Sequence, residues 1–175
     1  MIALDRRAAL VVAAAAALGA GAYFAFRPTD ESRIRQQLAK LAAAVHVTDA
    51  DVQTSAIGRL AHVSGLFEGL FDPDVRVSVP ELGSIPPGRR ALAEVMTGAP
   101  RFVRTLDVDF GSITVKLDDA GASAEVGATA DVAALDREGT ARKDKRAVDF
   151  RFVKQGGEWL IATVTVWTKE DARPE

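Results

Sequence analysis

Apolar residues recur along this chain with two spacings, one typical of helices and one typical of strands. In the first half, Ile34, Leu38, Leu41 and Val45 lie three or four residues apart, which predicts an amphipathic helix from Asp30 to about His46. A capping pattern at Thr48 predicts a second helix, with an apolar face running from Val52 to Phe71. A short helix is expected from Arg89 to about Met96.

In the second half, apolar and polar residues alternate. Long strands are predicted at 102–117, 122–135, 141–155 and 158–168, and a short strand over 75–79 precedes them after a turn at 72–74. The turns between the long strands are short and contain glycine or aspartate, so neighbouring strands are expected to pair antiparallel. Helices followed by strands predict an α+β domain.

The last predicted strand is apolar on both faces. Trp159, Ile161, Thr163, Thr165 and Trp167 share one face if the alternation is regular. Leu160, Ala162, Val164 and Val166 form the opposite face. Because one layer of helices covers only one face of a sheet, we expect the face from Leu160 to Val166 to contact a second copy of the chain or another envelope protein.

An uncharged run of nineteen residues, 8–26, precedes the domain. Its length is close to the roughly 20 residues that a helix needs to cross a membrane. Arg6 and Arg7 precede the run and acidic residues follow it, so the positive-inside rule predicts a single-pass anchor in the cytoplasmic (inner) membrane with the domain on the extracytoplasmic side.

A cleaved signal peptide is the alternative for this run. Small residues at Ala20, Gly21 and Ala22 fit a cleavage site, which would leave a secreted or periplasmic domain cut near Ala22. The continuation through Tyr23 to Phe26 favours the uncleaved anchor. Either way the chain divides into an anchor or signal segment, 1–27, and one domain, 28–175, beyond the cytoplasmic membrane.

Composition restricts the function classes. After residue 27 the chain carries 19 basic and 23 acidic residues, so no nucleic-acid partner is expected. A basic segment at 137–154 fits a solvated hairpin, with anionic lipid or an anionic partner as the alternative. The absence of cysteine excludes thiolate catalysis and disulfides, no metal-binding or phosphate-binding motif is present, and no cofactor is expected.

The order of elements resembles the nuclear transport factor 2-like superfamily, which includes SnoaL-type cyclases and ketosteroid isomerases. The features that carry the resemblance are the aromatic-rich strand that contains Phe150 and Phe152, the Gly156-Gly157-Glu158-Trp159 hairpin and the Gly88-Arg89-Arg90-Ala91 helix start. The resemblance implies a cone-shaped, curved antiparallel sheet wrapped around the N-terminal helices, with a pocket at its open end and dimers that pack through the sheet.

The resemblance also implies acid–base residues inside the cone, of aspartate, histidine or tyrosine type. The single tyrosine, Tyr23, lies in the apolar run and is not available. His46 fits a helix C-terminus, where a cation is favourable. His62 and Asp107 are the catalytic candidates, although a lone histidine is weak evidence of catalysis.

A ligand pocket is the second hypothesis for the cone. Its predicted members are Asp109, Glu125, Asp131, Trp159 and Trp167. Asp107 and Asp109 share one side of a strand, and Glu125, Thr129 and Asp131 share a face of its neighbour. If that face is concave, buried carboxylates have raised pKa values and are suited to proton transfer; if it is convex, they are solvated.

Two functions follow from these patterns. The first is a membrane-anchored, extracytoplasmic, non-catalytic domain used for dimerisation, assembly or holding a small-molecule ligand. The second is a cofactor-independent isomerase, cyclase or dehydratase with its site in the cone.

Overall fold

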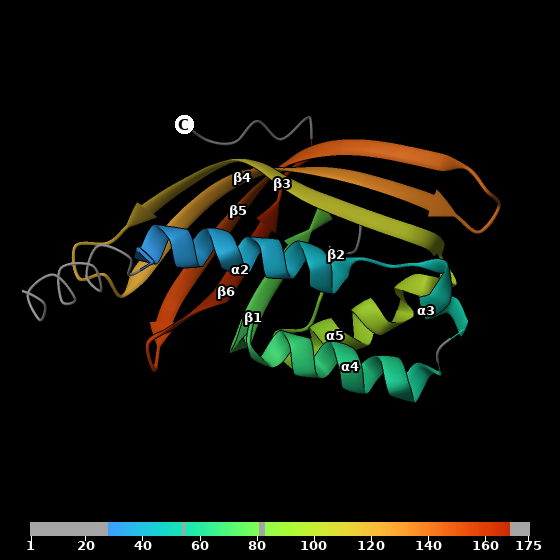
Figure 1. The fold of residues 1–175 in the computed structure, drawn as a ribbon, viewed down its shortest axis with the longest axis horizontal. Helices are drawn as coiled ribbons and strands as arrows, with labels where there is room; N and C mark the ends of the chain where they lie inside the picture. Colours follow the sequence, from blue (N-terminus) through green and yellow to red (C-terminus); the bar gives the residue numbers. More distant parts are fainter. Residues whose placement is uncertain (1–27, 54, 81–82, 169–175) are drawn as a thin grey trace, which may run out of the picture.

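The computed structural model of the chain describes residues 28–53, 55–80 and 83–168. These residues form helices packed against one face of a curved sheet (Figure 1). The predicted anchor over residues 8–26 lies outside the described residues. Within the described part, no helix is both long enough and apolar enough to cross a membrane.

The first helix is the one that the apolar spacing predicted. Helix α2 spans Asp30–Val45 and begins at Thr29, whose side chain accepts a hydrogen bond from the Ser32 backbone N–H. Its buried residues, Ile34, Gln37, Leu38 and Leu41, form the face that meets the sheet. The α5 helix, Arg89–Gly98, confirms the short predicted helix and extends two residues further.

The second predicted helix is divided in two. Thr48 and Asp51 form the predicted cap, but α3 ends after a single turn, Asp49–Gln53. A new helix, α4, spans Ala56–Glu68 with Ser55 as its N-cap. Phe67 is the only buried residue of α4, so the wide apolar face was overestimated. Two capping residues close together start two helices where the apolar period alone predicted one.

The four long strands lie close to their predicted positions. Strands β3 (Val103–Leu117), β4 (Ser123–Asp136), β5 (Ala141–Gln155) and β6 (Glu158–Val166) pair antiparallel in chain order. Strand β1, Phe71–Val79, is longer than predicted because the turn expected at 72–74 is part of the strand. A two-residue strand, β2 (Gly83–Ser84), pairs with β1.

The sheet is mixed rather than wholly antiparallel. Its order is β2-β1-β6-β5-β4-β3, and β1 runs parallel to β6. The parallel pair is possible because the long β1–β6 connection carries β2, α5 and strands β3 to β5, whereas the short turns that predicted antiparallel pairing join only the later strands.

One glycine of the predicted helix-start motif has a clear structural role. Gly88 has φ +108°, a conformation that side chains with a Cβ rarely adopt, and its N–H donates to the Val75 carbonyl at 2.8 Å. The next residue, Arg89, donates from its guanidinium to the Glu68 carbonyl. These contacts attach the start of α5 to β1 and to the end of α4.

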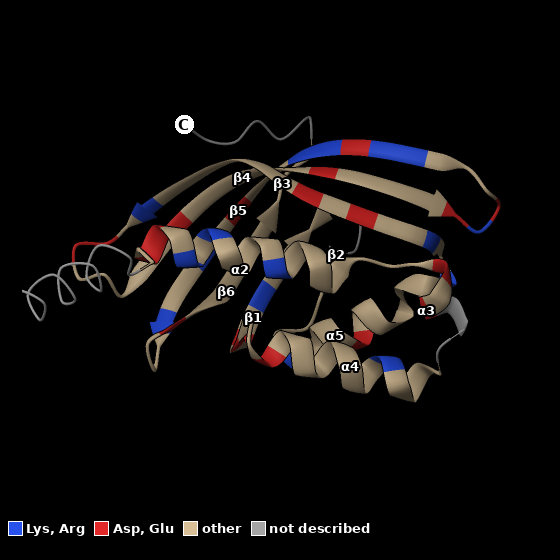
Figure 2. Ribbon diagram, viewed as in Figure 1, with Lys and Arg blue, Asp and Glu red and all other residues tan. Residues whose placement is uncertain are grey.

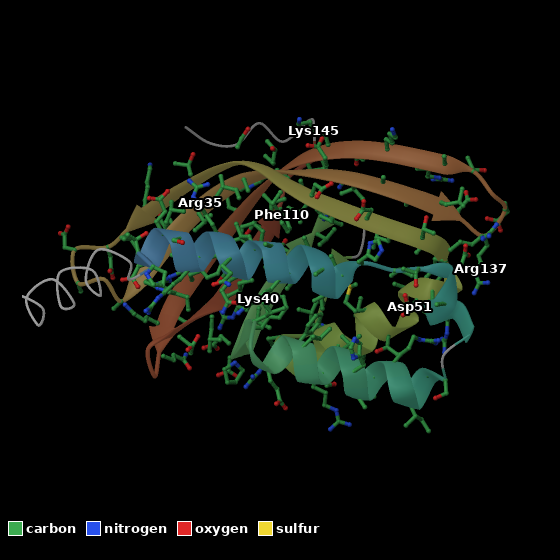
Figure 3. The ribbon with its side chains drawn as sticks, viewed as in Figure 1. Arg35, Lys40, Asp51, Phe110, Arg137 and Lys145 are labelled. Atoms are coloured by element: carbon green, nitrogen blue, oxygen red, sulfur yellow. The ribbon has the colours of Figure 1, made fainter. Side chains whose placement is uncertain are left out.

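The inner face of the sheet and α2 enclose the core. Its largest fully buried side chains include Trp159 and Phe152 on the sheet, Phe67 on α4, and Ile34 and Leu38 on α2. Phe110 of β3 packs against this core, between the sheet and α2 (Figure 3). The core therefore fills the space under the sheet at the α2 end.

A β-bulge in β6 corrects the predicted faces of the last strand. Phe152 pairs with Ile161, but Arg151 pairs with Thr163, so Ala162 is an extra residue. Trp159 and Ile161 point inward, and after the bulge Val164 and Val166 do so. The four residues Leu160, Ala162, Val164 and Val166 therefore do not form one outer face, because the bulge reverses the alternation within the set.

Candidate functional site

The inner face of the sheet borders an apolar cavity of about 500 Å³. Twenty-one described residues line it, and nineteen are apolar. The lining comes from the C-terminal half of α2 (Leu41, Val45), from α4 and α5, from β1, and from β3 to β6. The volume falls within the range of about 300–1,000 Å³ that small-molecule sites occupy.

Local sequence explains why the cavity is not filled. Among the buried alanines of β4, Ala130 lines the cavity and lies opposite Phe110 in the register with β3. Its small side chain leaves space that the larger residues of α5, such as Leu92 and Met96, border but do not fill. A space lined in this way accepts apolar groups.

Two charged side chains, Asp144 and Arg146, complete the described lining. The Arg146 Nε donates to the Asp144 Oδ2 at 2.6 Å, and the Asp144 Oδ1 accepts from the Lys145 backbone N–H at 2.9 Å. Their side chains are 36% and 23% exposed, so they lie where the cavity meets solvent. The cavity thus has an apolar interior and one polar, ion-paired part of its wall.

Sequence reasoning missed this pair, although the signal was available. Residues 144, 146, 148, 150 and 152 share one face of β5 by alternation. Val148, Phe150 and Phe152 are apolar, which identifies that face as the buried one. If the same alternation is continued from Val148 toward the β4–β5 hairpin, Arg146 and Asp144 also lie on the buried face. The segment was instead interpreted as a solvated basic hairpin.

The two predicted catalytic residues are outside the cavity lining. Asp107 is exposed on the outer face of β3, and its Oδ1 lies 3.2 Å from the His46 Nδ1. His62 is exposed on α4. The structure therefore brings Asp107 to the histidine at the end of α2 rather than to His62.

His46 and His62 both lie near Asp51. Hydrogen bonding from the Thr48 side chain is the largest cause that lowers the pKa of the Asp51 carboxyl, and the charges of the two histidines contribute less. Among the described residues, no group of three or more histidine, aspartate or glutamate side chains could hold a metal ion. This region accordingly has the character of a capping network at the start of α3.

The acidic strand residues lie on the outer face of the sheet. Asp109 pairs with Asp131 and Lys116 with Glu125 across β3 and β4, and all four are exposed. Figure 2 shows acidic positions along β3 and β4 and basic positions along β5. From the sequence, the face that carries these acidic residues could be concave or convex. In the structure it is the face of the sheet that is turned away from the helices.

A polar groove of about 600 Å³ crosses this outer face. Small residues, Thr114, Gly127, Thr163 and Thr165, contribute to it. Lys116, Glu125 and Arg151 follow one another across three strands, which places opposite charges directly beside each other. Of the predicted pocket residues, Glu125 is the one that lines this groove.

The two tryptophans have separate surroundings. Trp159 is 1% exposed and belongs to the core; its Nε1 donates to the Asp30 Oδ1 at 3.0 Å. Lys154 donates to the same carboxylate at 2.9 Å and lies 5.2 Å from the centre of the Trp159 ring. Trp167 donates to the Asp149 Oδ2 at 2.7 Å. Neither tryptophan is among the residues that line the cavity.

Comparison with known proteins yields matches of fold. No family model matches the chain, and no curated protein matches its sequence. An NTF2-like protein with a cystatin-like fold from Novosphingobium aromaticivorans matches with a TM-score of 0.62 at 16% identity, covering 98% of this chain and 94% of that one.

Two further solved structures show the range of proteins with this fold. A proposed scytalone dehydratase from Novosphingobium aromaticivorans has a TM-score of 0.64 at 16% identity, covering 83% of this chain and 95% of its own. A proposed calcium/calmodulin dependent protein kinase II association domain from Xanthomonas campestris has a TM-score of 0.59 at 17% identity, covering 81% and 90%. At these identities the likeness concerns the fold, and the described domain has the nuclear transport factor 2-like α+β fold.

Proposed function

We propose that this protein is a non-catalytic binding domain that holds an apolar ligand in its cavity. The observation that carries the proposal is the lining of the cavity. Of the twenty-one described residues that line its volume of about 500 Å³, nineteen are apolar. Such a site gains binding free energy from burying apolar surface, at roughly 25 cal/mol per Å². In the same proposal, the run at 8–26 anchors the domain outside the cytoplasm.

Ligand holding has more support than the other roles that the sequence suggested. The outer face, where a second copy was expected, has a polar groove, and two of its four expected contact residues, Val164 and Val166, turn to the core. An isomerase, cyclase or dehydratase would need a proton-transfer group at the ligand. Neither predicted catalytic residue, His62 or Asp107, is in the described lining, and the one carboxylate of that lining, Asp144, is ion-paired with Arg146.

A photo-crosslinking experiment on the full chain in lipid nanodiscs tests the proposal. The probe is a palmitate analogue with a diazirine in its chain, and the crosslinked peptides are mapped by mass spectrometry. We expect labelling at cavity residues such as Phe110 and Val148. Filling the cavity with Ala130→Phe should remove about nine-tenths of that labelling, since a phenyl group occupies space that the chain needs.

The matched control is Ala133→Phe, three residues along the same strand on its exposed outer side. It should leave cavity labelling unchanged. A second filling variant, Val108→Phe, covers the case in which Ala130→Phe fails to fold. Labelling confined to lipid-facing or surface peptides in the unsubstituted chain would contradict the proposal.

A further inference from the structure

A small polar pocket lies between α2 and the β5–β6 hairpin. Its volume is about 260 Å³, and none of its described lining residues lines the apolar cavity. Helix α2 contributes Arg33, Gln37 and Lys40, and the hairpin contributes Glu158 and Trp159. The volume is below the roughly 300–1,000 Å³ of sites for drug-sized molecules, so the pocket suits a smaller polar molecule.

Gln37 has a buried acceptor that the protein does not satisfy. The residue is 5% exposed. Its Nε2 donates to the Trp159 carbonyl at 2.8 Å and to the Gly69 carbonyl at 3.1 Å, which engages both amide hydrogens and fixes the orientation of the amide. The Oε1 is buried and has no hydrogen-bond partner among the described residues. A buried acceptor without a donor is costly, and a ligand that supplies an N–H or O–H group removes that cost.

The order of side chains along α2 indicates how the ligand's charges are arranged. Arg33, Gln37 and Lys40 are four and three residues apart, so they lie along one face of the helix. Along the helix axis, Gln37 lies about 6 Å from Arg33 and about 4.5 Å from Lys40, at a rise of about 1.5 Å per residue. A buried acceptor between two cations is complementary to a donor between two anions.

Glu158 completes the charge pattern from the other wall. Together with Arg33 and Lys40, it gives the described lining two positive charges and one negative charge. A molecule with two carboxylates and one ammonium group has the complementary charges. In an acidic α-amino acid the ammonium group is attached between the two carboxylates. Its three N–H donors are sufficient for both the Gln37 Oε1 and the Glu158 carboxylate.

We propose that this pocket binds an acidic α-amino acid, such as L-glutamate or L-aspartate. The ammonium group of the ligand donates to the Gln37 Oε1 and to the Glu158 carboxylate, and its two carboxylates bind Arg33 and Lys40. Because Lys40 and Glu158 are exposed, the pocket is accessible to a soluble ligand. This is a second site, and the inference does not depend on the proposed function of the apolar cavity.

Isothermal titration calorimetry on the full chain in lipid nanodiscs tests this inference. The probes are L-glutamate, glutarate, which lacks the ammonium group, and γ-aminobutyrate, which lacks the α-carboxylate. We expect L-glutamate to bind about tenfold more tightly than either analogue, because each analogue loses one set of hydrogen bonds to a charged group. Absence of binding by both L-glutamate and L-aspartate at about 10 mM overturns the inference, as does equal affinity for L-glutamate and glutarate.

Variants of the lining residues locate the binding. Lys40→Gln should lower the affinity for L-glutamate about tenfold. Gln37→Met removes the buried acceptor and should reduce the preference for L-glutamate over glutarate. Glu158→Gln, at an exposed position, should reduce the same preference and replaces Gln37→Met if that variant does not fold. An unchanged affinity in Lys40→Gln, or an unchanged preference in Glu158→Gln, shows that the amino acid binds elsewhere and overturns the assignment.

The matched control is Arg35→Gln on the same helix. Arg35 and Lys40 lie on opposite sides of α2 (Figure 3), and Arg35 donates to the Glu31 Oε1 and to the Ile113 carbonyl. This variant removes one positive charge, as Lys40→Gln does, but should keep both the affinity for L-glutamate and the preference over the analogues. A loss equal to that in Lys40→Gln would mean that the overall charge of α2, rather than the pocket, determines binding.

Discussion

The two faces of the sheet are built from the same strands but have opposite characters. The inner face is apolar, with Phe150, Phe152 and Ile161 buried against the helices. On the outer face, threonines and alternating charges border a polar groove. The difference shows that one sheet can supply an apolar cavity on one side and a polar surface on the other, because successive side chains of a strand point to opposite faces.

The largest expected effect comes from neighbouring residues on opposite faces. Phe152→Ala should lower the free energy of unfolding by about 3–5 kcal/mol, because the ring is 0% exposed and its removal leaves a cavity in the core. Arg151→Ala, one residue earlier and exposed, should change it by less than about 0.5 kcal/mol. Urea denaturation followed by tryptophan fluorescence measures both. Equal effects would mean that the two faces are not distinct at this position.

A smaller effect tests the bulge in β6. Val164→Thr places a hydroxyl in the core and should cost about 2 kcal/mol of unfolding free energy. Thr165→Val, on the groove side, should cost less than about 0.5 kcal/mol. With regular alternation through Ala162, Val164 would lie on the outer face, and Val164→Thr would then also cost less than about 0.5 kcal/mol. That result would restore the face that the sequence predicted.

The smallest of these effects concerns the carboxylate that bonds to the inner face. Asp30→Asn should cost about 1.5 kcal/mol at neutral pH, because Asp30 accepts from Trp159 and Lys154. The exposed neighbouring variant Glu31→Gln, in a surface pair with Arg35, should cost about 0.5 kcal/mol or less.

The pH dependence of this effect has a definite sign. Hydrogen bonds from Trp159, and then from Lys154, lower the pKa of Asp30 below its usual 3.8 in the folded protein. The unfolded chain therefore binds the proton more readily. The stabilisation is fully present above the unfolded pKa and is lost as the pH falls through the folded one, so the difference between Asp30→Asn and the unsubstituted chain should shrink in acid. A difference that is constant down to about pH 2 would exclude this carboxylate as its source.

Most of the fold followed from the sequence, and the exceptions have local physical causes. Period-two alternation located β3 to β6 because each has one face in the core. It failed within β6, where a single extra residue, Ala162, carries no compositional signal such as glycine. The prediction of a turn at 72–74 was also wrong, because these residues belong to β1. A proline such as Pro73 fits a strand at a position where no backbone N–H is needed for pairing.

The site was less predictable than the fold. Candidate residues were chosen by chemical type, which selected His62 and Asp107, whereas the cavity is defined by the absence of large side chains at alanines such as Ala130. Curvature decides whether a face of a sheet is enclosed, and alternation carries no information on curvature. Asp144 and Arg146 could have been found only by following the buried face of β5 past its apolar residues.

The contact of Asp30 with Trp159 and Lys154 also has a mechanical consequence. A tension applied through Pro28 reaches this contact at the first residue of α2, before the interior of the helix. The load would then be shared between α2 and the β5–β6 hairpin, which are distant in sequence but joined at this carboxylate. The fold would resist such a pull as one body instead of unwinding from its first turn.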